Sequence, residues 1–159
     1  MDTKRRSRKS QRGAAALEFA IILPVLMLLV FGMVDFAMTF NAQSTVANAA
    51  RDGARAASLG KKYAAAGTQI RGETSALLNS STIAYTICTA ATIDATTWSC
   101  SGTASGDSTT YDSKAAIDAI VRVTVSYRYS WITPLPGWVG MSNPVTVSQT
   151  SYMRIESTS

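Results

Sequence analysis

The amino-acid sequence predicts an α+β protein, in which one long N-terminal transmembrane helix continues into a domain with a small antiparallel sheet. Three observations lead to this prediction: an almost unbroken apolar run from Phe19 to Val34, a proline-free Ala-rich segment from Phe36 to Ser58, and period-two alternation beyond Asn79. An apolar run of about 20 residues is long enough to span a membrane as a helix. Strict alternation of apolar and polar residues is typical of a half-buried strand.

The length of the apolar helix fits a bilayer. Ala14 to Val34 is 21 residues, which at about 1.5 Å per residue gives roughly 31 Å, against a bilayer core of about 30 Å. We expect Asp35 at the outer interface, where a charge costs little. A cleaved signal peptide is less consistent with the sequence, because its apolar region is usually shorter. The predicted divisions are a basic leader (1–13), a transmembrane helix (14–38), its extension (39–59) and an α+β domain (60–159).

The positive charge of the chain is confined to its start. The first 13 residues hold six basic side chains and one acid, whereas nine basic and nine acidic residues follow. Basic residues beside a membrane span normally mark its cytoplasmic side, so the leader predicts a cytoplasmic N-terminus and an extracytoplasmic domain. A basic run can also bind nucleic acid, but its position beside a span favours the role in topology, and we expect no nucleic-acid partner.

Pro24 lies inside the predicted membrane helix and lacks the N–H that would bond to the Ala20 carbonyl. A helix kink is therefore expected at Pro24. Two interpretations stay open: membrane helices simply tolerate proline, or Pro24 provides a flexible joint.

Small residues form a stripe on the helical extension, and Gly60 suits the end of that helix. The stripe allows another element to approach closely, either the sheet of the same chain or a neighbouring subunit. Its members are Ala47, Ala50, Ala54 and Ala57. A second, weaker helix is predicted over Lys61–Leu78.

Three strands are predicted in the second half of the chain, over Thr82–Thr89, Ala119–Ile132 and Val145–Glu156. Thr89–Tyr111 is rich in Thr, Ser and Gly and indicates a long surface loop. Cys88 and Cys100 are the two cysteines, on the side of the membrane opposite the basic leader, which is oxidising in bacteria. A disulfide between them is therefore favoured over two buried thiols.

The composition argues against catalysis. The chain has no histidine, the commonest general base and a frequent metal ligand, so we expect no enzyme activity, no metal, no cofactor and no small-molecule substrate. Four scattered acids show no calcium-loop spacing and are expected to be exposed loop charges: Asp94, Asp107, Asp112 and Asp118. Three tryptophans could stack on a ligand, but packing is the favoured role: Trp98, Trp131 and Trp138.

The entrance to the membrane helix carries the most informative pattern. A basic leader is followed by Gly13, then by small or apolar residues from Ala14 to Leu17, and then by Glu18 and Phe19. A charge near hydrocarbon is costly, so an acid at this position is a functional hypothesis by default. The pattern resembles a prepilin processing site, in which a peptidase cuts after the glycine. The alternative is that Glu18 reaches the nearby membrane interface.

The resemblance extends further along the chain, through Arg12–Ala20, Leu23-Pro24, Gly32–Phe36 and Asn48–Arg55. Over roughly Arg12 to Ala57 the sequence resembles the TadE-like family, the pseudopilins of the tight-adherence (Flp-type) pilus machinery. The resemblance implies a pilin-like fold and an inner-membrane precursor that a prepilin peptidase cuts. It also implies that other pilins and platform proteins are partners in assembling an adhesive filament.

Two other classes of function compete with this interpretation. One is a permanently anchored extracytoplasmic binding or sensor module, which would keep its leader and use a Trp-containing loop. The other is a membrane-tethered hydrolase, which the lack of histidine disfavours.

Overall fold

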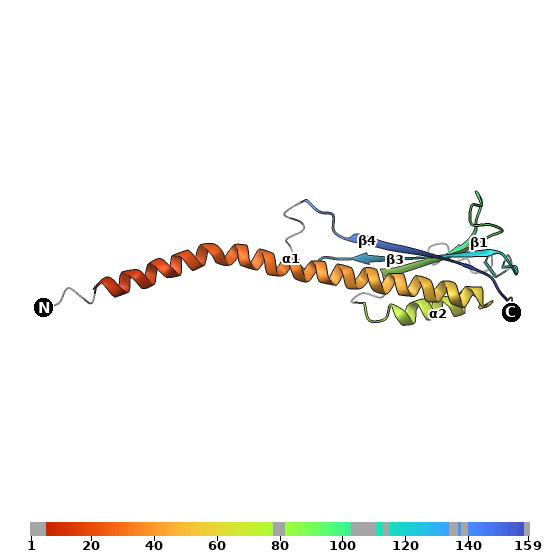
Figure 1. Ribbon diagram of the computed structural model, residues 1–159, viewed down its shortest axis with the longest axis horizontal. Helices are drawn as coiled ribbons and strands as arrows, with labels where there is room; N and C mark the ends of the chain where they lie inside the picture. The colour runs from red at the N-terminus through yellow and green to blue at the C-terminus, as the bar shows by residue number, and fades with distance from the viewer. Residues whose placement is uncertain are drawn as a thin grey trace.

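The computed structural model describes residues 6–77, 82–102, 111–112, 115–133, 137 and 140–157, with side chains from residue 13 onward. The side chains of the basic leader, together with Asp107 and Trp138, lie outside the described residues. The molecule is an elongated helix with a small α+β domain wrapped around its second half (Figure 1). This arrangement confirms the predicted fold class.

Helix α1 (Arg6–Ser58) is continuous over 53 residues and runs through the boundary predicted at residue 38, which stays a prediction. From residue 13 to 34 every side chain is exposed, whereas burial begins at Asp35. The helix ends as the sequence predicts. Gly60 adopts a left-handed φ of 77°, and the N–H groups of Gly60 and Lys61 donate to the carbonyls of Ala57 and Ala56 at 3.1 Å each, which is a Schellman cap.

The sheet has four antiparallel strands in the order β2-β1-β3-β4. They are β1 (Ile83–Ala90), β2 (Ser99–Gly102), β3 (Ile120–Tyr129) and β4 (Val145–Arg154). The alternation predicted for β3 is confirmed, because every second residue from Val121 to Tyr129 is buried. This buried face packs on the second half of α1 (Figure 1).

The small-residue stripe of α1 packs within the same chain. Ala50, Ala54 and Ala57 are buried in the core, and Ala47 at the edge is half-buried. Gly53 extends the stripe, since a Cβ there would lie 2.7 Å from two side-chain carbons of Ile70 on α2. The alternative of a neighbouring subunit is therefore not needed to explain these positions.

Helix α2 (Tyr63–Glu73) is shorter than the predicted segment and lies beside the end of α1 (Figure 1). Its first N–H group, on Tyr63, donates to Asp112 Oδ1 at 2.8 Å. Asp118 forms an ion pair with Arg154 at 3.0 Å. Both acids are exposed, as the sequence predicts. The structure adds their partners: Asp112 caps a helix, and Asp118 pairs with the last residue of β4.

The prediction of one long surface loop over Thr89–Tyr111 is partly wrong, because β2 lies inside this range. In β2, Cys100 is the direct cross-strand partner of Cys88. A strand of four residues rich in Ser and Gly has no propensity signal of its own, so pairing with β1 and the disulfide determine it.

Candidate processing segment and membrane anchor

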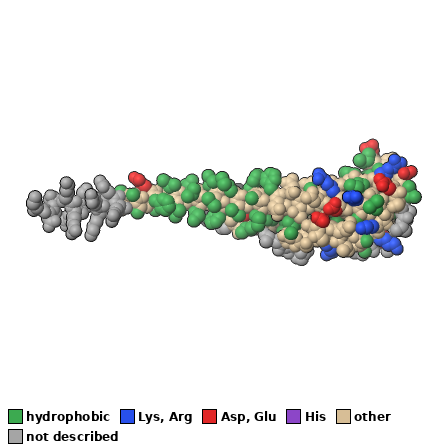
Figure 2. Space-filling model, turned by 60° about the horizontal axis from the view of Figure 1, so that its bottom comes forward, with side chains coloured by type: hydrophobic (Ala, Val, Ile, Leu, Met, Phe, Trp, Pro, Cys, Tyr) green, Lys and Arg blue, Asp and Glu red, His purple; other side chains and the backbone are tan. Residues whose placement is uncertain are grey.

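The candidate processing segment, residues 13–34, is helical and contacts none of the described domain. Apolar side chains cover it in Figure 2, and the acidic and basic groups gather over the domain, apart from one acid at the beginning of the segment. Glu18 is the only charged residue of this segment. The segment is part of the one helix among the described residues that is long and apolar enough to cross a membrane.

The predicted processing residues lie at the beginning of this exposed helix. Gly13 has open space around it, since a Cβ built there meets no atom within 4 Å. Glycine destabilises a helix by about 1 kcal/mol relative to alanine, so the backbone around Gly13 and Ala14 unwinds more easily than its neighbours. Glu18 and Phe19 lie one turn or more further along and are both exposed. The structure thus leaves the Gly13–Ala14 bond accessible and its surroundings free of tertiary contacts.

Helix α1 passes through Pro24 without a break in its helical assignment. Figure 1 shows that α1 changes direction within its red-to-orange part. The specific assignment of a kink to Pro24 stays a prediction, as does the choice between tolerance and a flexible joint.

Asp35 connects the exposed segment to the domain. Its side chain is only 3% exposed. One carboxylate oxygen accepts a hydrogen bond from the backbone N–H of Ile132 at 3.2 Å, and the other accepts one from the hydroxyl of Thr133. Burial, followed by the negative charge of Asp35, raises the pKa of nearby Tyr129. Asp35 therefore fastens the segment after β3 to the point where α1 leaves the domain.

The placement of Asp35 at the outer membrane interface stays a prediction, and the structure adds its burial and its hydrogen bonds. In the sequence, Asp35 is recognisable only as a lone acid directly after an apolar run. The groups that donate hydrogen bonds to its carboxylate lie 97 and 98 residues further along the chain. No local pattern predicts a contact of that separation.

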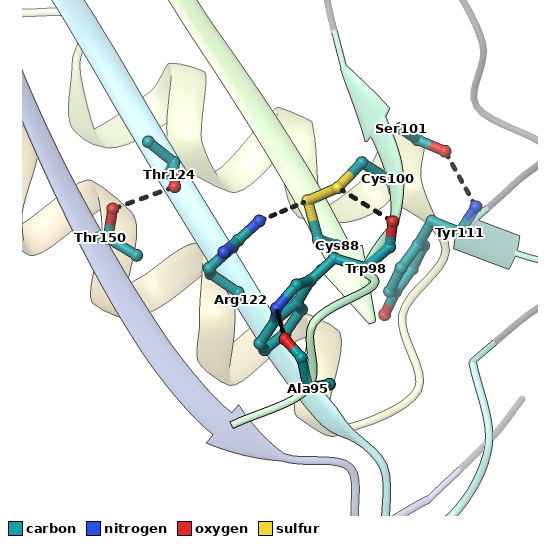
Figure 3. The surroundings of a disulfide bond; sticks show 9 residues. All are labelled: Cys88, Ala95, Trp98, Cys100, Ser101, Tyr111, Arg122, Thr124 and Thr150. Atoms are coloured by element: carbon teal, nitrogen blue, oxygen red, sulfur yellow. Dashed lines mark hydrogen bonds between the residues drawn. A yellow bond between two sulfur atoms is a disulfide. The ribbon is translucent and has the colours of Figure 1, made fainter. Parts of the chain in front are cut away.

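The opposite part of the sheet carries the disulfide (Figure 3). Cys88 and Cys100 are bonded across β1 and β2, with 4.0 Å between their Cα atoms. Arg122 lies beside them, with its guanidinium 4.3 Å from the centre of the Trp98 ring and an N–H 3.7 Å from Cys88 Sγ. The predicted disulfide is therefore present in the structure.

The tryptophans have packing partners. Trp98 lies between Arg122 and Tyr152, whose ring centre is 6.1 Å away, and Trp131 contacts Tyr129 edge-on at 5.5 Å. Arg122 therefore covers one face of the Trp98 ring, and the contact with Tyr152 is edge-on. In the part of the chain that the structure describes, no group of His, Cys, Asp and Glu is arranged to hold a metal ion.

A hollow of about 430 Å³ lies between the end of α1 and α2. Side chains of both signs line it, among them Asp52, Glu73, Arg55 and Lys61.

Together, these features define a class: a membrane-anchored protein with a single apolar N-terminal helix and a small α+β domain. Residues 13–55 match the family model described as TadE-like protein. This stretch agrees with the predicted resemblance over Arg12 to Ala57, so that part of the chain is similar to the TadE-like family. No curated protein and no solved structure matches the chain.

Proposed function

We propose that this protein is a minor pilin-like component, a pseudopilin, of a Tad-type pilus and secretion assembly in a bacterial inner membrane. In this proposal the N-terminus is cytoplasmic, the domain is extracytoplasmic, and a prepilin peptidase cuts the chain between Gly13 and Ala14. The protein is the substrate of that enzyme and not itself an enzyme. The single observation that carries the proposal is an exposed, family-matched helix with one carboxylate near its beginning.

Cleavage would give Glu18 a function. A charge in a membrane helix costs roughly 2.5–3.5 kcal/mol on insertion scales. Removal of the leader creates a positive α-amino group on Ala14. At about 4 Å and an effective dielectric constant near 20, two opposite charges attract by about 4 kcal/mol, which offsets that cost. The Ala14 amine of a neighbouring subunit therefore neutralises Glu18 and fixes the stagger between two packed helices.

The leader also determines whether the helix stays in the membrane. Its six basic residues and one acid carry the whole net charge of the chain, +5. Basic residues hold a helix end on the cytoplasmic side. After their removal, the apolar segment can be drawn out of the bilayer into a bundle of equivalent helices, where its exposed side chains are covered by those of its neighbours.

The processing test is mass spectrometry of the N-terminus in membrane and sheared-surface fractions. We expect the mature chain to begin at Ala14. Gly13→Ala is expected to reduce processing at least tenfold, because a side chain obstructs the peptidase at the bond it cuts. Recovery of the chain with residues 1–13 attached, under conditions in which pili form, would contradict the proposal and favour the permanently anchored binding or sensor module.

The assembly test uses Glu18. Glu18→Ala and Glu18→Gln are expected to be processed but to reach the sheared-surface fraction at least tenfold less than wild type, because the Ala14 amine then lacks its counter-charge. Glu73→Ala is the control, since Glu73 is an exposed acid on α2. If Glu18→Gln assembles like wild type, the charge pairing is wrong even when processing occurs.

A further inference from the structure

The end of the domain nearest the exposed half of α1 presents uncovered apolar and aromatic side chains. Phe36 and Phe40 contact each other edge-on, with ring centres 4.7 Å apart, on a face of α1 that the domain leaves exposed. Ile132 and Met141 are 53% and 51% exposed, and Trp131 is half-buried beside them. We call these five residues the membrane-proximal patch.

Hydrogen bonds hold the patch at one level of the molecule. The N–H of Ile132 donates to Asp35, the residue before Phe36. The indole N–H of Trp131 donates to the carbonyl of Ser142, the neighbour of Met141, at 3.0 Å. The last residues of β3 and the first residues of β4 lie at the end of the sheet nearest the exposed half of α1 (Figure 1).

The length of α1 places this level in the bilayer interface. If the apolar core of about 30 Å ends near Val34, each headgroup layer covers a further 5–8 Å or so. At about 1.5 Å per residue, that layer extends roughly three to five residues beyond Val34. Phe36 lies within it, whereas Phe40, six residues or about 9 Å beyond Val34, lies just past its outer boundary. Trp131 and Ile132 lie at the same level, because Asp35 holds them there.

The chemistry around the patch fits lipid better than water. No charged residue occurs in 36–50 or in 129–145, the two stretches of sequence that contain the five patch residues. Arg128, directly before the second stretch, is exposed on β3. Asp35, the nearest acid, is buried and hydrogen-bonded. Tryptophan and other aromatic rings concentrate at membrane interfaces, where an apolar ring and a polar N–H are both accommodated.

We propose that the membrane-proximal patch inserts into the outer headgroup layer of the bilayer, so that the domain rests on the membrane surface rather than standing free of it. The occupant is the lipid interface, and Asp35 is the positioning residue that holds the segment after β3 against α1 at that depth. The inference depends on membrane anchoring and not on the proposed role in a pilus.

Depth-dependent fluorescence quenching of the full chain in phosphatidylcholine–phosphatidylglycerol vesicles tests this placement. The variant Trp98→Phe/Trp138→Phe leaves Trp131 as the only tryptophan, and Trp131→Phe/Trp138→Phe leaves Trp98; excitation at about 295 nm avoids the tyrosines. Trp98 packs on Arg122, seven residues from Tyr129 along β3, which is about 23 Å at roughly 3.3 Å per residue. Trp98 is therefore an internal control within the same domain.

We expect lipids brominated near the headgroup to quench Trp131 at least threefold more strongly than they quench Trp98. We also expect these lipids to quench Trp131 more strongly than lipids brominated deep in the acyl chain. Ile132→Ser/Met141→Ser changes two exposed side chains, so the domain should remain folded, as judged by an unchanged melting temperature, while quenching of Trp131 falls at least twofold. Equal, weak quenching of Trp131 and Trp98 would overturn the proposal. A second result would also overturn the proposal: cross-linking of two Met141→Cys copies in dilute vesicles, together with no quenching of Trp131 by brominated lipid or by aqueous iodide. The patch would then be an interface between two protein copies.

Discussion

Tyr111 and its neighbour Asp112 join the sheet to both helices. Its backbone N–H donates to Ser101 Oγ on β2 at 2.9 Å (Figure 3). Its buried hydroxyl donates to the carbonyl of Ala57 on α1 at 3.2 Å. The next residue, Asp112, caps α2 through the N–H of Tyr63. The short segment 111–112 thus connects three elements that are distant in sequence.

Burial, followed by the charge of Asp112, raises the pKa of Tyr111 to about 12. An unfolded tyrosine titrates near 10. Well below pH 10 the phenol is therefore neutral in both the folded and the unfolded state, and Tyr111 contributes no pH dependence to the free energy of unfolding. Between pH 10 and 12 the unfolded state loses its proton first. The free energy of unfolding therefore falls as pH rises, by up to about 3 kcal/mol.

Tyr111→Phe separates the hydrogen bond from this titration. At pH 8 we expect the variant to be about 1 kcal/mol less stable, because it loses the bond to Ala57. Above about pH 11 we expect it to become the more stable protein, because the phenylalanine does not ionise. Urea unfolding of the full chain in detergent micelles at pH 8, 10 and 11.5 measures both differences. A gap that stays constant with pH would contradict the assignment.

The residue scale is where prediction from sequence was least complete. The roles of Asp35, Tyr111 and Asp112 depend on partners about 50 to 100 residues away. A local pattern contains no information on such contacts, because they follow from the register of the sheet on α1. The Cys88–Cys100 pair was predictable, since only two cysteines were available and both lie on the same side of the membrane.

At the scale of elements, the close approach of α2 to the sheet depends on one glycine. A Cβ at Gly67 would overlap the hydroxyl of Tyr85 on β1 and lie 2.6 Å from its Cζ. Tyr85 is itself buried, so its ring has little room to move. Gly72, on the same helix, has no atom within 4 Å of an added Cβ. The two glycines therefore provide a matched pair.

Gly67→Ala is expected to destabilise the domain by about 1–3 kcal/mol, since overpacking of a core costs that much. Gly72→Ala is expected to be neutral or to stabilise by up to about 1 kcal/mol, because alanine is the better helix former. Chemical unfolding followed by far-UV circular dichroism compares the two variants with wild type. Similar effects from both would mean that α2 does not pack on Tyr85 as the structure describes.

Elements were predictable to the extent that their own side chains specify them. The alternation of β3 identifies its buried face, and Gly60 marks the end of α1. Strand β2 was missed because Ser99, Cys100, Ser101 and Gly102 have no apolar alternation. Their pairing comes from the neighbouring β1, which is a property of the sheet and not of the segment.

At the scale of the whole molecule, α1 is one helix with two environments. Before Asp35 its side chains are exposed in the isolated chain, and from Asp35 onward one face is buried by the sheet and α2. The first half is therefore available to lipid or to neighbouring helices, whereas the second half forms the core of the domain. Both the proposed assembly role and the proposed contact with the membrane surface depend on this division.

The same substitution in each half tests the division directly. Val46 is 0% exposed and Val25 is 67% exposed, and both lie on α1. Val46→Ala is expected to reduce the free energy of unfolding by about 1.5–3 kcal/mol, because it leaves a cavity in the core. Val25→Ala is expected to change it by less than about 0.5 kcal/mol, as is usual for exposed positions.

Both variants carry the same change in helix propensity, so the difference between them reports tertiary packing alone. Thermal or urea unfolding of the full chain in one detergent, monitored by near-UV circular dichroism of the domain, gives the two values. If Val25→Ala destabilised the domain as much as Val46→Ala, the exposed half of α1 would have to pack against the domain. The segment that the processing and assembly proposals require to be free would then be occupied within the monomer.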